Sequence, residues 1–231
     1  MKSQQSGFTL VEIAIVLVII GLLLGGILKG QELINSAKVK NLANDFRTIP
    51  TYIYAYQDKF KALPGDDCIP GTHAGAPATD VPGAPGACGN RGNGVIEGNP
   101  TSAGALTEEA WLFWQHVRVA NLASGPTNTG DATYRPKNAL DGTIGIASLV
   151  NNTAGTVTEN AVITAPTRMN GTYQVCSENI IGKFVKQLDI QMDDGNTQTG
   201  SMRASLMSVP ATAIATNAID DAVPYMVCMT F

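Results

Sequence analysis

A single acidic residue lies inside the most apolar part of the chain. Glu12 is the only charged side chain between Lys2 and Lys29. A carboxylate at the centre of a membrane-length helix costs roughly 2.5–3.5 kcal/mol, and it costs less near an interface. The position of Glu12 therefore predicts a partner of opposite charge.

The element that must position Glu12 is a long apolar segment, residues 8–28, which reads FTLVEIAIVLVIIGLLLGGIL. Sixteen of its 21 residues are apolar and none is proline. At about 1.5 Å per residue, a helix of this length spans a bilayer core of about 30 Å. A secretory signal peptide fits poorly, because the run is too long and ends without an A-x-A cleavage site. A plain signal anchor fits the hydropathy but leaves Glu12 unexplained.

The composition divides the chain into two parts. The 231 residues are 44% hydrophobic and only 15% charged, with a net charge of −4. About a quarter of the residues are charged in an ordinary soluble domain. The uncharged N-terminus explains part of this difference, and the rest of the chain is mildly acidic and rich in glycine. This balance excludes a basic nucleic-acid binder driven by bulk charge, since phosphate contacts need basic residues.

The residues SGFTLVEIAIVLVIIGLLLG, which begin at Ser6, closely resemble the class III signal of type IV pilins and of type II secretion pseudopilins. That signal has a short polar leader ending in glycine, then an aromatic residue, Thr-Leu-Val-Glu and a long apolar helix. Here the leader is Met1–Gly7. The resemblance implies cleavage after Gly7 by a prepilin peptidase on the cytoplasmic side, and N-methylation of the new terminus at Phe8. It also implies that the apolar run stays in the mature protein.

The same resemblance implies a role for Glu12. In filaments of this kind the apolar helices pack into a bundle, in which the amine of Phe8 is a buried positive charge. Glu12 lies four residues further along the helix and is expected to pair with the Phe8 amine of a neighbouring subunit. A buried ion pair is better suited to setting the axial register than to adding stability.

After the apolar segment the pattern becomes amphipathic, and a helix from Phe8 to about Lys61 is expected. Pro50 lies inside it and is expected to kink the helix or weaken one turn. The sequence ALPGDD, residues 62–67, ends it. Apolar residues recur at spacings of three and four, which indicates one helical face buried by a globular head. They are Leu42, Phe46, Ile49, Ile53, Tyr56 and Phe60.

A loop rich in glycine and proline, residues 64–104, follows this helix and shows no regular period. Within it, GNRGNG at residues 89–94 is interpreted as an ordinary turn rather than a cation-binding loop, because few carboxylates lie near it in the sequence. The resemblance places the chain beyond the membrane in an oxidising compartment, where disulfides form. Four cysteines allow three pairings. We favour Cys68–Cys88, which staples the loop, with Cys176–Cys228, which pins the last strand.

A second helix is predicted over residues 107–123, TEEAWLFWQHVRVANLA, with Thr107 as its N-cap. Its tryptophans, Trp111 and Trp114, are interpreted as core residues rather than as a surface for stacking a ligand. His73 and His116 are the only histidines, and two histidines make no metal site without carboxylates.

The C-terminal part is expected to form strands at Thr143–Val150, Ala161–Thr164, Tyr173–Cys176 and Tyr225–Phe231. Ser177 is expected to cap a helix over Glu178–Gln191.

The end of that helix, LDIQMDDGNTQTG, is similar to helix ends in pilin-like proteins. Asp189, Asp193 and Asp194 gather carboxylates at a turn containing Gly195, and clustered oxygen atoms suit a hard cation. A Ca²⁺ site would fit type II secretion pseudopilins. The alternative is a helix C-cap with solvated aspartates.

The patterns predict a long N-terminal helix followed by short strands, and the resemblance implies an α+β pilin fold in which that helix packs on a small antiparallel sheet. The expected parts are a cleaved leader (1–7), a transmembrane assembly helix (8–28), its amphipathic continuation (29–61) and a globular head (62–231). The expected function is that of a structural subunit of a type IV filament, a pilin or pseudopilin, and not of an enzyme. No cofactor other than the Ca²⁺ considered above is expected.

The expected partners are other pilin or pseudopilin subunits, the prepilin peptidase and the inner-membrane assembly platform, and no nucleic acid. The expected location is the bacterial inner membrane, crossed once with the N-terminus cytoplasmic and the head periplasmic, and then a filament. Two alternatives stay open: a minor or tip pilin for adhesion or DNA uptake, and a signal-anchored periplasmic protein unrelated to filaments. The sequence distinguishes neither pilus from secretion system nor major from minor subunit.

Overall fold

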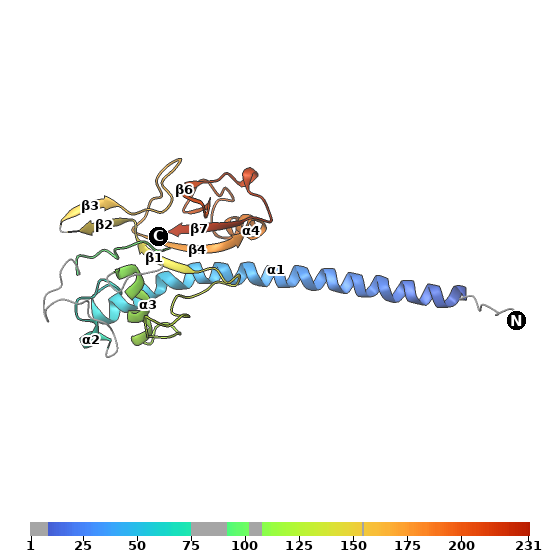
Figure 1. Cartoon of the computed structure of the whole chain (residues 1–231), viewed down its shortest axis with the longest axis horizontal. Coiled ribbons are helices and arrows are strands. Elements are labelled where there is room, and N and C mark those ends of the chain that lie inside the picture. The colour runs from blue at the N-terminus through green and yellow to red at the C-terminus, as the bar shows by residue number, and fades with distance from the viewer. Residues whose placement is uncertain (1–8, 75–91, 102–107, 154) are drawn as a thin grey trace. The chain divides into compact units, whose positions relative to one another are not determined.

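The structure is a computed structural model that describes residues 9–74, 92–101, 108–153 and 155–231 (Figure 1). The fold is α+β, with a long N-terminal helix followed by an antiparallel sheet and short helices. The chain divides into two compact units, Met1–Lys40 and Asn41–Phe231. The α+β class, with a long N-terminal helix followed by an antiparallel sheet, is the one predicted from the sequence.

Helix α1 (Leu10–Phe60) continues without interruption for 51 residues and includes Pro50. It ends where Lys61 takes a φ of +56°, the left-handed conformation common after helix C-termini. Phe60 is half-buried and packs on the Tyr56 ring with 4.6 Å between ring centroids. The predicted apolar face lies in the second unit, and these members of it are at most 4% exposed: Leu42, Phe46, Ile49, Ile53 and Tyr56.

The second unit is built around a five-stranded antiparallel sheet in the order β1-β4-β7-β5-β6. A separate hairpin pairs β2 with β3. Buried residues dominate β4 and β7, as expected for strands with a neighbour on each side. The strands are β1 (Ile144–Ser148), β2 (Val150–Thr153), β3 (Thr156–Glu159), β4 (Tyr173–Ile181), β5 (Met202–Leu206), β6 (Val209–Ala213) and β7 (Pro224–Thr230).

Short helices complete the second unit. Helix α3 contacts β1, and helix α4 contacts β4, β5 and β7. In α3, Trp114 is buried, whereas Trp111 is half-buried and packs on the Tyr134 ring with 4.8 Å between ring centroids. The helices are α2 (Pro70–His73), α3 (Glu109–Val119), α4 (Gly182–Met192) and the 3₁₀ turn η1 (Thr216–Ala218).

The predicted helix over Glu178–Gln191 with a Ser177 cap is wrong at its start. Strand β4 continues to Ile181, and α4 begins only at Gly182. Ser177 is paired with Ile144 on one side and Val227 on the other, so the sheet ladder takes it instead of a helix cap.

Two other boundaries also differ from the prediction. Helix α3 ends at Val119 rather than residue 123, because Asn121 takes a left-handed φ of +60° that a helix does not continue through. Its predicted N-cap, Thr107, lies outside the described residues. The stretch Thr143–Val150 forms β1 but is broken by a bend at Leu149 before β2 begins.

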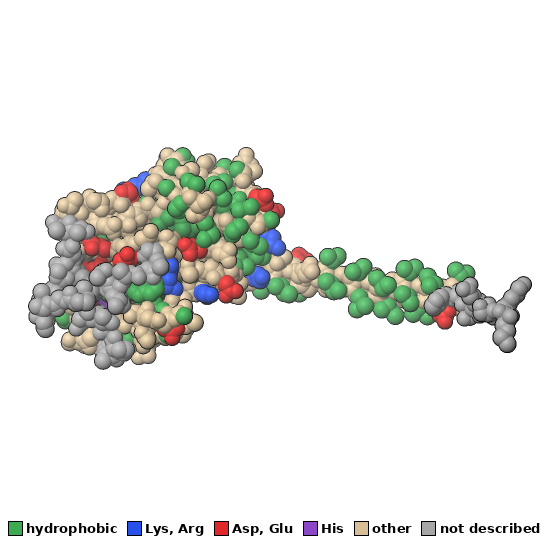
Figure 2. All heavy atoms as spheres, viewed as in Figure 1, with side chains coloured by type: hydrophobic (Ala, Val, Ile, Leu, Met, Phe, Trp, Pro, Cys, Tyr) green, Lys and Arg blue, Asp and Glu red, His purple; other side chains and the backbone are tan. Residues whose placement is uncertain are grey.

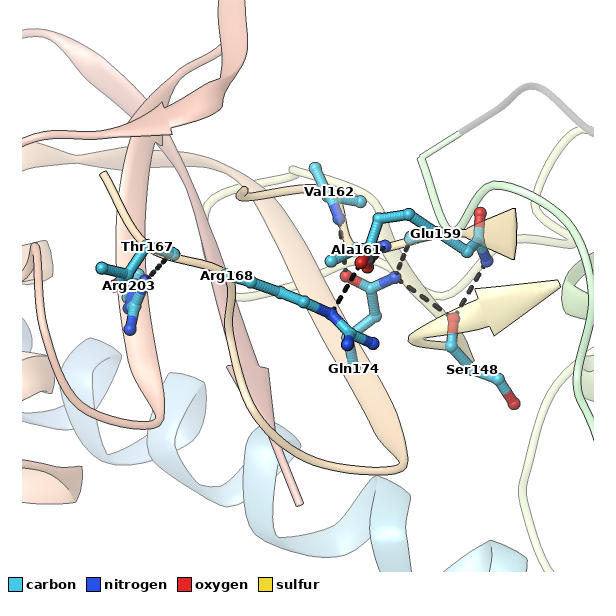
Figure 3. Close-up of polar contacts among 9 residues, drawn as sticks. Ser148, Glu159, Ala161, Val162, Thr167, Arg168, Gln174 and Arg203 are labelled. Atoms are coloured by element: carbon cyan, nitrogen blue, oxygen red, sulfur yellow. Dashed lines mark hydrogen bonds and ion pairs between the residues drawn. The ribbon is translucent and has the colours of Figure 1, made fainter. Parts of the chain in front are cut away.

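The predicted strand Ala161–Thr164 is absent from the sheets of the described chain, although Ile163 in it is fully buried. The Thr164 N–H donates to the Ala211 carbonyl on β6 at 3.0 Å, and a side chain holds the start of the segment. Gln174 on β4 donates its Nε2 to the Asn160 carbonyl at 2.6 Å and accepts the Val162 N–H at 2.9 Å (Figure 3). Apolar residues therefore lie inside here without forming a strand.

Candidate functional sites

The N-terminal part of α1 exposes apolar side chains on all sides. Its large hydrophobic residues from Leu10 to Leu28 are 46–91% exposed, and Figure 2 shows them along the visible face of the helix. In the described chain, α1 is the one helix long and apolar enough to cross a membrane, and its most apolar window is 0% buried. A helix that is apolar all round needs lipid or other helices to cover it.

Glu12 and Thr9 cap each other at the start of this helix. The Glu12 carboxylate accepts the Thr9 backbone N–H at 2.8 Å and the Thr9 hydroxyl at 2.7 Å. The Glu12 N–H donates back to the Thr9 hydroxyl at 3.3 Å. This is a reciprocal capping box, and its Thr-x-x-Glu signature is visible in the sequence. Gly7 and Phe8 lie outside the described residues.

Residues 2–28 match the family model of the prokaryotic N-terminal methylation motif. The chain carries a type IV pilin-type class III signal. The motif supports a pilin-like or pseudopilin precursor, implies processing by a prepilin peptidase and assembly with other subunits, and supports membrane anchoring through the apolar helix. No curated protein and no solved structure matches the chain.

The structure contains a disulfide between Cys176 and Cys228. The two residues face each other in register on β4 and β7, with 4.1 Å between their α-carbons, and both are at most 1% exposed. Cys68 is also disulfide-bonded, and Cys88 lies outside the described residues. The bridge joins β7, the last strand and the middle one of the sheet, to its neighbour β4.

The turn after α1 contains two buried carboxylates that the sequence analysis did not single out. Asp66 accepts the backbone N–H groups of Gly92, Asn93 and Gly94 at 2.5, 3.2 and 2.9 Å. Burial raises the Asp66 pKa, and these three donors oppose the rise. The end of the GNRGNG segment is thus a turn that wraps an internal carboxylate.

The second of these carboxylates, Asp67, contacts side chains of both α1 and α2. Its Oδ2 accepts the Tyr56 hydroxyl at 2.7 Å and lies 2.9 Å from Nδ1 of His73. Tyr56 and His73 both lie in the second unit. The contact of His73 with Asp67 therefore has a structural role.

The structure brings the three predicted aspartates together at the end of α4. One carboxylate oxygen from each of Asp189, Asp193 and Asp194 lies within 4.8 Å of the others. Asp193 accepts the Met202 N–H at 2.8 Å and the Ser201 hydroxyl at 3.1 Å. In the part of the chain that the structure describes, this is the one group of three or more acidic, histidine or cysteine side chains that converges in this way.

Asp189 distinguishes this cluster from a solvated helix end. It is 1% exposed, and neither carboxylate oxygen has a hydrogen-bond partner among the described residues. Burial, together with the charges of Asp194 and Asp193, raises its pKa to about 7. The Gly195 backbone N–H is near enough to oppose this rise, although it does not reach hydrogen-bond geometry. Asp193 does serve as the C-cap residue of α4, so the alternative prediction describes part of the cluster. An orphaned buried carboxylate facing two others fits a bound hard cation.

Proposed function

We propose that this chain is a structural subunit of a type IV filament, a pilin or pseudopilin. The class III signal at residues 2–28, which leads directly into an exposed apolar helix, is the observation that carries the proposal. Residues 1–7 are the leader. Cleavage of the bond between Gly7 and Phe8 removes it, and Phe8 is then N-methylated. Residues 8–28 insert in the inner membrane, residues 29–61 continue the helix, and residues 62–231 form the periplasmic head.

Assembly, and not catalysis, is the proposed mechanism. The assembly platform extracts the subunit from the membrane, and the apolar helices of successive subunits cover each other. In the structure Glu12 is satisfied by Thr9 of its own chain. In the filament the Glu12 carboxylate pairs with the Phe8 amine of a neighbouring subunit. This ion pair compensates both charges for the water that they lose, and it sets the axial register of the subunits.

The mature N-terminus tests this proposal. Mass spectrometry of the chain isolated from membranes should find a terminus at Phe8 that carries one methyl group. A chain that still begins at Met1 would instead support the alternative of a signal-anchored protein unrelated to filaments. Electron microscopy of a deletion strain, with twitching and secretion assays, then separates pilus from secretion system and major from minor or tip subunit.

Glu12→Ala tests the register contact. The variant should reach the membrane at the normal level but fail to form filaments, because the neighbour's amine would be buried without a counter-charge. Glu32→Ala is the matched control on the same helix, since Glu32 forms only an exposed pair with Lys29 at 2.6 Å. Normal filament formation by Glu12→Ala would show that register is set elsewhere.

We also propose that Asp189, Asp193 and Asp194 hold Ca²⁺. The support is the convergence of three carboxylates, one of them buried without a hydrogen bond. A bound cation would neutralise their mutual repulsion. The full chain in detergent should melt at a higher temperature in CaCl₂ than in EGTA, and Asp189→Asn should remove that difference. Asp131→Asn, which changes an exposed turn aspartate, should keep it. Melting that is insensitive to the chelator would eliminate the site.

A further inference from the structure

The loop that connects α4 to β5 is bonded to the aspartate cluster at its start and to β5 at its end. Asp193 accepts the N–H of Met202, the first residue of β5, and Asp194 accepts the Thr199 hydroxyl at 2.7 Å. Asp194 also accepts the Asn196 N–H at 2.8 Å. Two of the three clustered carboxylates therefore shape this loop directly.

Thr197, at the centre of the loop, connects it to β5 and to the residues that follow β6. Thr197 is 1% exposed, and its hydroxyl donates to the Ile214 carbonyl at 2.6 Å. The Thr197 carbonyl accepts the Ala204 N–H at 2.9 Å, and the Ala204 carbonyl accepts the Ile214 N–H at 2.9 Å. The backbone N–H of Thr197 donates to the Thr216 hydroxyl at 3.0 Å. Hydrogen bonds of Thr197 therefore couple the conformation of the loop to β5 and to Ile214, the residue that follows β6.

The hydrogen bonds from Thr199 and Asn196 lower the pKa of Asp194, and Arg203 on β5 is near enough for its charge to help lower it. Among the described residues no lysine or arginine forms an ion pair with the three aspartates. The nearby Arg203 on β5 donates to the backbone carbonyls of Thr167 (Figure 3) and Gly200. Without a cation, opening of the loop is the movement that separates the carboxylates and gives Asp189 access to water.

We propose that a divalent cation held by Asp189, Asp193 and Asp194 locks the α4–β5 loop and thereby controls the order of the β5–β6 hairpin. The inference rests on the proposed cation site and adds a consequence of its occupancy. Loop opening pulls Asp193 and Asp194 away from Asp189, so it must release the ion. It also breaks the contacts of Thr197, so the hairpin loses its link to the loop at the same step. Bound cation makes both events rarer.

Hydrogen exchange on the full chain in detergent micelles tests this coupling. The reporters are the amides of Ala204 and Ile214, which lie on the path from the loop to the hairpin. In CaCl₂ at 100 times the Kd, their exchange should slow by about 100-fold relative to EGTA, since opening is opposed by the factor 1 + [L]/Kd. Amides of α3 should not change, and MgCl₂ measures how strictly the site selects the larger ion.

Thr197→Val removes the side-chain bond between the loop and Ile214 without removing a ligand. The variant keeps the side-chain shape and loses the bond to Ile214, so it should bind Ca²⁺ by calorimetry as the wild type does. Ca²⁺ should still slow exchange of the Met202 and Ala204 amides, which are held by Asp193 and by the Thr197 carbonyl, but should slow that of Ile214 less than in the wild type. Thr197→Ser keeps the hydroxyl and should behave as the wild type, and the wild-type comparison stands even if Thr197→Val fails to fold.

The possible failures are distinguishable. No heat of Ca²⁺ binding, with the same exchange in CaCl₂ and EGTA, would overturn the cation site and this inference with it. Ca²⁺ binding with unchanged exchange at Ala204 and Ile214 would leave the site intact and overturn the coupling alone. Neither failure bears on the filament proposal, which depends on the N-terminal helix.

Discussion

Gly65 donates its backbone N–H to Nδ1 of His116 across 2.9 Å. The contact joins the turn that follows α1 to the buried side of α3. Gly65 has a φ of +92°, and a Cβ at this position would collide with the backbone carbonyl of Glu109. The turn and α3 therefore meet backbone to backbone, and only glycine leaves room for this approach.

Gly65→Ala should destabilise the second unit by about 2–5 kcal/mol, because it adds left-handed strain to a clash with rigid backbone. Gly94→Ala is the matched control, since Gly94 has a φ of +82° but open space around its α-carbon. That control should cost only about 1–2 kcal/mol. Denaturant unfolding followed by tryptophan fluorescence measures both, because Trp111 and Trp114 lie on α3. Equal losses in the two variants would show that close packing at Gly65 has no special importance.

The long helix and its buried face could be predicted because the signal is periodic and local. Residues from Leu42 to Tyr56 repeat every three or four positions, and the turn that follows contains Pro64 and Gly65. The start of α4 could not be predicted in this way, because serine suits both a helix cap and a strand. Pairing of Ser177 with Ile144 and Val227, both distant in the chain, decides for the strand.

The aspartate cluster shows the same limit at the candidate site. The spacing of Asp189 and Asp193 on a helix end places their carboxylates near each other, so their convergence could be predicted. The burial of Asp189 depends on the packing of α4 against β4, β5 and β7, which no local pattern encodes. Similarly, the sequence shows Asp66 and the Gly92–Gly94 turn, but it does not show that the N–H groups of this turn donate to the Asp66 carboxylate.

Replacing both Cys176 and Cys228 by alanine should lower the free energy of unfolding by about 4 kcal/mol. The bridge closes a segment with a sequence separation of 52, and the chain-entropy model gives this magnitude for a loop of that size. Denaturant unfolding of the double variant, compared with the oxidised wild type, measures the loss. The reduced wild type should lose at least as much, because reduction also opens the disulfide of Cys68. A small loss in the double variant would mean that the strand pairing alone holds β7.

Asp45→Asn should stabilise the chain at neutral pH and leave it unchanged in acid. Burial raises the pKa of Asp45 to about 6, and the described residues give its carboxylate no hydrogen bond or ion pair. The folded state therefore binds the proton more tightly than the unfolded state, whose pKa is near 3.8. The cost of the charge is absent below pH 3.8, grows between pH 3.8 and 6, and is complete above pH 6.

The gain from Asp45→Asn should be on the order of 1 kcal/mol at pH 7–8, after discounting for partial solvation of the side chain. Unfolding free energies measured at pH 3.5 and pH 7.5 check the sign. Asp58→Asn is the control on the same helix, because Asp58 is exposed and pairs only with Lys61. A variant at Asp45 that is equally stable or less stable at pH 7.5 would contradict a desolvated carboxylate there.

Thr9→Val should loosen the first turn of α1, because it removes the hydroxyl that both donates to the Glu12 carboxylate and accepts the Glu12 N–H. A lost N-terminal cap costs about 1 kcal/mol, so amide exchange at Glu12 and Ile13 should speed up about fivefold. Exchange measured on the uncleaved full chain in micelles reports this directly, with the amides of residues 42–56 as an internal reference. Thr9→Ser keeps the hydroxyl and should exchange as the wild type does. If Thr9→Val exchanges at the wild-type rate, the capping box does not hold this end, and Glu12 is already free to meet a partner outside its own helix.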